Sequence, residues 1–414
     1  MDEAMVISIK RIIKVFKSLV MSTHLQNNAI VVDPHVEESS TDGKNNEEVS
    51  LEDIGVHETT TNDVEEYKKT NQDNVCDNNE TNIATTDNQE IINENEVGDS
   101  KTILAVKDAF DNDFIRESTY LENGMGIVIG ASLRGKSHKE SGTECQDFHL
   151  YGQLGKEWHA LIVSDGAGSA KYSGRGSMAN CNIALQLLSK MVAENRWIEN
   201  DVFPSELEWY IQCRSIFEHM KLIYRGKIAE MEDGTRETDF NATIILCLIT
   251  PNGLLTAHIG DGRMGYLSCE GEWKELMVPH KGEEANQTLF LQNSWTTPQV
   301  PAFKVGGVFV PETRVVREIP NAIVLMSDGF ERASWECVMF NKTTGRYEYI
   351  NKPHPEFMNP LIDALLEESP ADRLQLLIDI MDRGTKACEQ ERDDKTMLLV
   401  IVTKDDNDNI PCCD

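Results

Sequence analysis

The sequence predicts an α+β fold in which two antiparallel β-sheets pack together and helices cover their outer faces. Between residues 124 and 403, short apolar runs bounded by turn residues recur, and such runs are typical of buried strands. Two longer stretches repeat their apolar residues at helical spacing. Strands followed by paired helices, a β-meander and a final strand favour this layered arrangement.

The ordered region is expected to begin near Gly124, with a first strand at Gly126–Ser132 and then a polar loop from Leu133 to Cys145. Asp147–Tyr151 and Trp158–Val163 flank a Gly-rich turn and are predicted to form a hairpin. One strand leaves an end of this hairpin and the other returns to it. Asp147 and Asp165 are therefore expected at the same end.

Two helices are predicted next. Apolar residues from Met178 to Val192 fall on one helical face. Ser205 and Glu208 match a capping box and open a helix that continues through Tyr224. We interpret both apolar stripes as surfaces that pack on the core.

The rest of the ordered region reads as a meander, an irregular stretch, and strands around one helix. Residues 279–320 are interrupted by proline and are expected to form an extended connection or flap. A helix is predicted to start at Ser369–Pro370 and to end near Gly384, because proline suits the first helical position. The predicted strands are Ala242–Thr250, Leu254–Gly260, Arg263–Ser268, Trp273–Val278, Ala322–Ser327 and Thr396–Val402.

Composition divides the chain into three parts: an acidic leader at 1–120, a folded domain at 121–404 and an acidic tail at 405–414. Residues 30–100 hold 20 acidic and 3 basic side chains, and residues 22–120 have few aromatics, so we predict disorder there. Such a segment serves as a solvated spacer or as a regulated docking tail. Residues 5–20 read as a short basic amphipathic surface helix or as a frayed leader.

The overall charge and the cysteines exclude several classes of protein. A formal charge of −31 argues against nucleic-acid binding, which requires a concentrated basic surface. The 10 cysteines form no CxxC pair, so neither a zinc ribbon nor a disulfide framework is indicated. No apolar run is long enough for a transmembrane helix, and the start does not resemble a signal peptide. These features predict a cytoplasmic protein.

Aspartates follow or precede several predicted strands, and three of them stand in a strand–Asp–Gly pattern. These are Asp165–Gly166, Asp261–Gly262 and Asp328–Gly329, and Asp147 and Asp393 take similar positions. Five carboxylates brought together repel one another unless cations compensate them, and oxygen ligands favour Mg²⁺ or Mn²⁺ over zinc. Two such ions roughly 3.5–4 Å apart activate a water for in-line phosphoryl displacement. The alternative is that the aspartates belong to separate turns.

Five segments in this order resemble the metal-dependent protein phosphatases of the 2C type, and in particular a bacterial branch with a Ser-His…Cys-Gln-Asp opening. The segments are SHKESGTECQD, LIVSDGAGSA, AHIGDGRMGYL, VLMSDGFE and RDDKTMLLVIV, and the resemblance covers about residues 124–403. It implies a four-layer αββα sandwich and Mn²⁺ or Mg²⁺ dependence with two ions. It also implies phosphoserine and phosphothreonine substrates on a phosphoprotein, with a serine/threonine kinase as a candidate partner.

The resemblance also implies roles for single residues. It makes Asp165 the acid that bridges both metals, and it makes Asp147 the acid that holds a metal-bound water. The other implied metal ligands are the carbonyl of Gly166, the carboxylates of Asp328 and Asp393, and Asp261 for a weaker third ion. Asp394 stands beside Asp393, and either acid could be the ligand. We prefer Asp393 because it aligns with the first aspartate of the motif.

The sequence departs from the family pattern at several points. Gln146 stands where many relatives have glutamate, and Ala167 stands where many eukaryotic members have the histidine of Asp-Gly-His. No arginine occupies the position commonly used to grip phosphate. His138 is our candidate for that grip, with Lys136 adding charge, although a lone loop histidine is more often a surface residue.

These observations predict a serine/threonine phosphatase in which Asp147, Asp165 and His138 are catalytic. Two alternatives remain from the sequence. Gln146 and Ala167 are also compatible with a catalytically weak or silent member that binds phosphoproteins as a scaffold. A two-metal hydrolase of small phosphoesters is the other.

Overall fold

The computed structural model describes residues 115–155, 157–231, 234–280, 288–292, 303–305 and 308–403. The predicted disordered leader before residue 115, the helix expected at 5–20 and the acidic tail at 405–414 all lie outside the described residues. None of the described helices combines the length and the apolar character that a membrane span requires.

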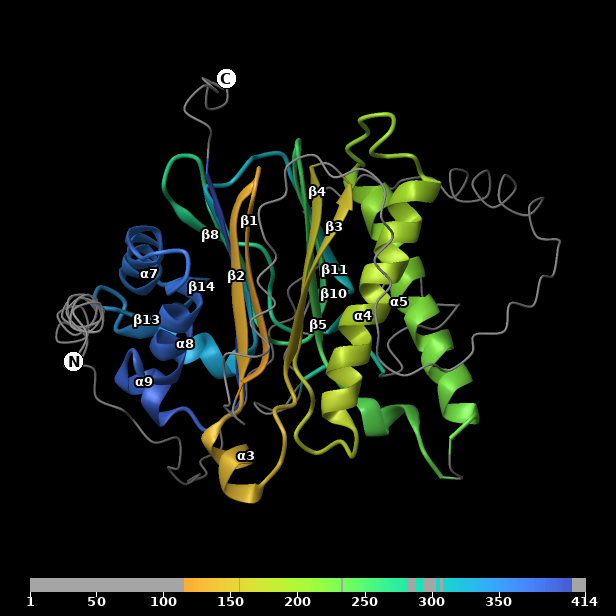
Figure 1. Ribbon diagram of the computed structural model, residues 1–414, viewed down its shortest axis with the longest axis horizontal. Helices are drawn as coiled ribbons and strands as arrows, with labels where there is room; N and C mark the ends of the chain where they lie inside the picture. Colours follow the sequence, from red (N-terminus) through yellow and green to blue (C-terminus); the bar gives the residue numbers. More distant parts are fainter. Residues whose placement is uncertain are drawn as a thin grey trace, which may run out of the picture. The chain divides into compact units, whose positions relative to one another are not determined.

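Two antiparallel sheets lie face to face, and helices cover the outer face of each, which confirms the predicted αββα sandwich (Figure 1). In spatial order, the six-stranded sheet contains β1 (Ile115–Asn123), β2 (Gly126–Leu133), β15 (Lys395–Val402), β12 (Ala322–Met326), β7 (Arg263–Leu267) and β8 (Trp273–Glu275). The five-stranded sheet contains β11 (Glu312–Val316), β6 (Gly253–Ile259), β5 (Ile244–Thr250), β4 (Trp158–Ser164) and β3 (Phe148–Gly155).

The two outer layers consist of helices that come from different parts of the chain. On the five-stranded sheet lie α4 (Ser173–Glu194) and α5 (Glu206–Ala229), and on the six-stranded sheet lie α7 (Pro355–Glu367), α8 (Arg373–Arg383) and α9 (Lys386–Gln390). The capping box predicted for α5 is present, because the Ser205 side chain accepts from the Glu208 backbone and the Glu208 side chain from that of Ser205. Both apolar stripes pack on the core, as predicted, except that Met178 at the start of the first stripe is exposed.

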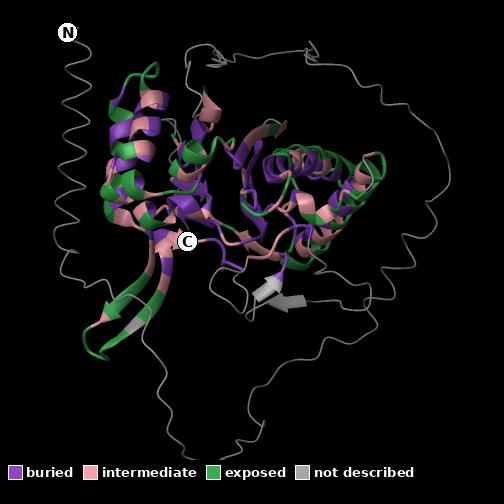
Figure 2. Cartoon of the chain, turned by 90° about the horizontal axis from the view of Figure 1, so that it is seen from below, coloured by how far each residue is buried: buried purple, intermediate pink, exposed green. Residues whose placement is uncertain are grey.

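Both faces of each sheet are buried, which explains why the strands read as continuous apolar runs instead of alternating ones. In β4, Leu161 and Val163 point between the sheets, whereas Ala160 and Ile162 point toward the helices. Buried residues gather accordingly inside the sandwich (Figure 2). The seven cysteines in the described part of the chain are free thiols, most of them buried.

The structure differs from the sequence prediction in several elements. β1 begins at Ile115, before the expected start near Gly124. It is an edge strand with partly buried side chains, and its pairing with the buried β2 holds it in place. The expected polar loop after β2 contains the helix α3 (Lys136–Ser141). α8 begins at Arg373 instead of Pro370. Within the expected flap, β11 pairs with β6.

The largest unpredicted region lies between residues 328 and 368. Here the structure contains η3 (Asp328–Phe330), α6 (Glu331–Ser334), β13 (Trp335–Asn341), β14 (Arg346–Pro353) and α7. β13 and β14 pair only with each other and belong to neither large sheet. Smaller elements outside this region are η2 (Glu237–Phe240), β9 (Phe303–Val305) and β10 (Val308–Val310).

Candidate active site

Two loops of the five-stranded sheet bring the first two predicted acids together. Asp147 directly precedes β3 and Asp165 directly follows β4. The register pairs Phe148 with Ser164, so the two aspartates lie at the same end of the strand pair, as the sequence predicted. The chain after Asp165 is held against the next strand, because the Asp165 backbone N–H donates to Thr243 Oγ1 (3.0 Å) and the Thr243 N–H donates to the Asp165 carbonyl (2.8 Å).

The other predicted acids lie close enough to Asp165 to change its ionisation. Burial raises the pKa of the Asp165 carboxyl well above its usual range. The negative charges of Asp147, Asp328, Asp393 and Asp261 raise it further. The structure therefore brings the five predicted aspartates into one cluster.

Asp328, which follows β12 in the six-stranded sheet, is likewise surrounded by negatively charged carboxylates. Burial, followed by the charges of Asp261 and Asp393, raises its pKa to about 7, although a hydrogen bond with Asp165 acts in the opposite direction. Asp261 in turn accepts a hydrogen bond from the Thr288 hydroxyl. Carboxylates that raise one another's pKa in this way are stabilised by any cation bound among them.

The residues fit a hard divalent cation in donor type and in charge, because the cluster consists of carboxylate oxygens. Among the residues that the structure describes, however, no group of three His, Cys, Asp or Glu side chains is arranged closely enough to hold a metal ion. The side chains would have to draw together around an ion. Close backbone packing requires glycine at position 166, since a Cβ there would lie 2.7 Å from the Gln146 carbonyl oxygen and 2.8 Å from that of Ser173.

Asp147 is buried and is held by the protein itself. Its Oδ2 accepts a hydrogen bond of 2.6 Å from the hydroxyl of Ser327, at the end of β12. Burial, followed by the charge of Asp394, raises its pKa well above the usual range. Asp147 thus reaches from the five-stranded to the six-stranded sheet.

The adjacent acids Asp393 and Asp394 have different surroundings. Asp393 is exposed, and its Oδ1 accepts from the Asp394 backbone N–H (2.9 Å). Asp394 is buried, and its two carboxylate oxygens accept from the backbone N–H groups of Gly135 (2.6 Å) and Gln146 (2.5 Å). The acid that the sequence analysis set aside is therefore a clamp on the loop that carries Asp147.

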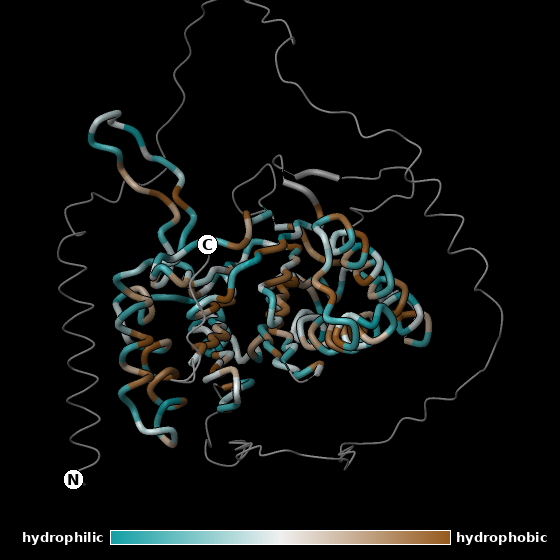
Figure 3. The backbone as a smooth tube through the Cα atoms, turned by 90° about the horizontal axis from the view of Figure 1, so that it is seen from above, coloured by the Kyte–Doolittle hydropathy of each residue, from teal (hydrophilic) through white to brown (hydrophobic). Residues whose placement is uncertain are grey.

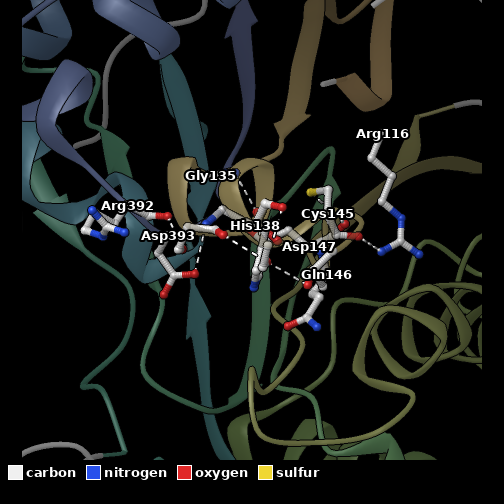
Figure 4. Close-up of polar contacts among 12 residues, drawn as sticks. Arg116, Gly135, His138, Cys145, Gln146, Asp147, Arg392 and Asp393 are labelled. Carbon is white, nitrogen blue, oxygen red and sulfur yellow. Dashed lines mark hydrogen bonds and ion pairs between the residues drawn. The ribbon is translucent and has the colours of Figure 1, made fainter. Parts of the chain in front are cut away.

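His138 lies on α3, beside the carboxylate of Asp394. Its Nδ1 stands 2.9 Å from Asp394 Oδ1, and Figure 4 shows the ring between Asp393 and Asp147. Lys136, which we expected to add charge beside it, instead donates from Nζ to the carbonyl of Glu389. His258 and His280, two further histidines of the domain, are buried and stacked with their ring centres 4.4 Å apart.

Arg116 is a residue that the sequence analysis did not consider for the site, because it fell within the predicted leader. From β1, its guanidinium donates to the carbonyls of Cys145 and of Gly174 (2.6 Å), and it lies 5.5 Å from the centre of the Phe148 ring (Figure 4). It thereby connects the Asp147 loop to α4. The only available signal was a single arginine before a weak strand pattern.

The sequence profile described as protein phosphatase 2C matches residues 134–378, more than half of the chain. The chain belongs to the protein phosphatase 2C family. It is accordingly a serine/threonine protein phosphatase by family, and protein phosphatase 2C enzymes are metal-dependent. No curated protein sequence gives a significant match.

Several solved structures resemble this protein phosphatase 2C domain. The serine/threonine phosphatase Stp1 from Staphylococcus aureus is 12% identical with a TM-score of 0.41, over 67% of this chain and 95% of that one. The S. agalactiae serine/threonine phosphatase is 17% identical with a TM-score of 0.42, over 67% and 99%. RsbX in complex with magnesium is 14% identical with a TM-score of 0.39, over 69% and 100%.

Proposed function

We propose that the protein removes phosphate from phosphoserine and phosphothreonine residues with the help of two Mn²⁺ or Mg²⁺ ions. The observation that carries this proposal is the gathering of Asp147, Asp261, Asp328 and Asp393 around Asp165, near enough for their charges to act on its carboxyl. Divalent cations bound there supply Lewis-acid activation of water and neutralise charge on the phosphoryl group. Asp165, Asp328, Asp393 and the Gly166 carbonyl would hold the two main ions, and Asp261 would hold a weaker third.

Asp147 is assigned to orient the attacking water. It is fixed by the hydroxyl of Ser327, and a carboxylate is a group that can take up a proton from water. The water oxygen bonds to phosphorus, and the bond from phosphorus to the serine oxygen breaks. Inorganic phosphate and a free hydroxyl are the products.

His138 is assigned to the leaving side of the reaction. With Nδ1 turned toward Asp394, its Nε2 is the nitrogen left for the substrate. A proton on Nε2 binds a phosphate oxygen in the ground state and transfers to the serine oxygen as the ester bond breaks. His138 thus takes the place of the missing arginine and of the histidine replaced by Ala167.

Hydrolysis of an aryl phosphate by the full chain, with Mn²⁺ and with EDTA, tests the proposal. We expect Mn²⁺-dependent turnover that Asp165→Asn lowers by a factor of at least about a hundred, while the circular dichroism spectrum stays unchanged. Asp363→Asn, an exposed aspartate on α7, is the matched control and should retain full activity. Unchanged turnover by Asp165→Asn would refute the assignment, and no turnover at all would favour the phosphoprotein-binding scaffold. Turnover rates on a panel of nucleotides, sugar phosphates and phosphopeptides distinguish a protein phosphatase from a two-metal hydrolase of small phosphoesters.

A further inference from the structure

The β13–β14 hairpin stands out from the sandwich as a ribbon with exposed faces (Figure 2). Val338, Met339, Phe340 and Tyr349 each expose between 47% and 58% of their surface. Exposed apolar side chains gathered on a two-stranded ribbon are unusual, because such a ribbon has little core of its own. Figure 3 shows the corresponding apolar segments within the projecting ribbon.

Three of these four apolar side chains lie on one face of the ribbon, and Met339 lies on the other. Val338 pairs directly with Tyr349, and directly opposed residues point to the same side. Phe340 lies two residues beyond Val338 and therefore shares that face. The outer edge of each strand has no strand partner among the described residues, so an extended polypeptide could add there by backbone hydrogen bonds.

The tip of the ribbon is cationic. Lys342 and Arg346 are exposed, and neither side chain makes an ion pair with another described residue. At the base, by contrast, Lys352 is paired with Glu336 (3.3 Å). Lys342 follows the strand that carries Val338 and Phe340, whereas Arg346 pairs with Asn341 and therefore lies on the opposite face, beside the exposed Glu348. In a chain with a formal charge of −31, a tip with two cations and one carboxylate still forms a local site for negative charge.

The base of the ribbon is fastened to the sandwich and follows shortly after Asp328 in the chain. The buried Trp335 donates from Nε1 to Asn351 Oδ1 (3.0 Å), and Asn351 donates from Nδ2 to the Met277 carbonyl (2.9 Å). The buried Arg263 forms an ion pair with Glu331 (2.6 Å), which also accepts from Cys337. Only η3 and the short helix α6 separate Asp328 from β13.

We propose that this hairpin docks the polypeptide around the phosphorylated residue and favours extended segments that carry acidic and apolar side chains. The inference rests on the proposed phosphatase function, of which it specifies the substrate class. The apolar face and the free strand edges receive the extended backbone and one apolar side chain. Lys342 and Arg346 receive carboxylates that the rest of this acidic protein repels.

Binding of labelled phosphoserine peptides to the full chain in EDTA, where turnover is suppressed, tests the docking step alone. One peptide carries aspartates and a leucine beside the phosphoserine, and the other carries alanine at the aspartate positions. We expect Lys342→Glu with Arg346→Glu to weaken binding of the acidic peptide about fivefold, the size expected for two exposed charge contacts. The alanine peptide should bind unchanged. Val338→Ser with Tyr349→Ser should weaken both.

The control is Lys190→Glu with Lys227→Glu, an equal charge change at exposed positions on α4 and α5. Equal binding of the acidic peptide by the wild type and the hairpin variant overturns the proposal, as does equal weakening in the control. Faster aryl phosphate turnover in Lys342→Glu with Arg346→Glu would indicate that the acidic leader occupies the hairpin in the wild type. If the wild type is a dimer and Val338→Ser with Tyr349→Ser is not, the hairpin binds a second copy of the chain. Either result overturns substrate docking. Absence of hydrolysis refutes only the phosphatase function, since binding is measured separately.

Discussion

Each sheet contains one antiparallel strand pair with an acid before one strand and an acid after the other. The acids in corresponding positions of the two pairs have similar surroundings. In the five-stranded sheet, Asp147 precedes β3 and Asp165 follows β4. In the six-stranded sheet, Asp394 precedes β15 and Asp328 follows β12. The acids before the strands are buried and bonded to protein donors, whereas those after the strands face other carboxylates.

The difference between the two positions separates acids that are bonded to protein donors from acids whose charged neighbours are other carboxylates. Asp147 is held by Ser327 of the other sheet, and Asp394 holds the backbone of Gln146 in the other sheet's loop. Both bonded acids therefore fasten one sheet to the other. Asp165 and Asp328 have carboxylates as their charged neighbours, so their charge is available to a cation and costs stability without one.

The largest effect should follow from neutralising the acids after the strands. Asp165→Asn and Asp328→Asn should each lower kcat for an aryl phosphate about a hundredfold to a thousandfold, because each removes charge that acts on the reacting group. In EDTA the same variants should unfold at equal or higher urea concentration than the wild type, since repulsion is relieved. Lower stability of the metal-free variants would contradict the comparison.

Acid sensitivity should reside in the five-stranded sheet. Burial lowers the pKa of His159 on β4 to about 4, below the unfolded value near 6.5, so the folded state binds fewer protons. The contribution of neutral His159 to the free energy of unfolding is fully present above pH 6.5. It falls by about 3 kcal/mol as the pH drops toward 4. Urea unfolding from pH 7.5 to 4 should show a smaller loss in His159→Asn than in the wild type. The exposed His219→Gln should behave as the wild type does.

The neighbouring acids before β15 provide an internal contrast. Asp394→Asn should lower the free energy of unfolding by about 2 kcal/mol, because an amide group would face N–H donors now bonded to a carboxylate. Asp393→Asn should change it by less than about 0.5 kcal/mol, as is usual for an exposed side chain. Both should lower activity. Equal stability of the two variants in chemical denaturation would disprove the division of roles.

Cation binding should change stability less than the loss of the Asp394 carboxylate does. At a concentration of Mn²⁺ ten times its Kd, the free energy of unfolding should rise by about 1.4 kcal/mol through mass action. The increase should reverse on addition of EDTA and should be absent in Asp165→Asn. A thermal melt with and without Mn²⁺ measures it, and an equal shift in the variant would locate the ion elsewhere.

The sequence predicted the sandwich and the aspartate cluster well because both depend on patterns within single segments. The strand–Asp–Gly pattern is local, and apolar runs such as that of β4 mark buried strands directly. The capping box of α5 is equally local. Long-range pairing then brings these segments together.

The missed features depend on partners far along the chain. Nothing in Asp394 itself indicates that it accepts hydrogen bonds from Gly135 and Gln146. The β13–β14 hairpin was missed because its exposed apolar residues do not alternate with polar ones as in a half-buried strand. β1 was missed because its order comes from its neighbour β2 and not from its own composition.

The bond between Arg116 and the Cys145 carbonyl has a practical consequence for shortened forms of the protein. A chain cut at Leu121, where composition alone would place the domain boundary, loses this guanidinium together with half of β1. The carbonyl two residues before Asp147 would then have no donor from β1, and the catalytic loop could shift relative to α4. Weak activity in such a truncated protein would reflect this lost brace, and it would be mistaken for a regulatory effect of the acidic leader.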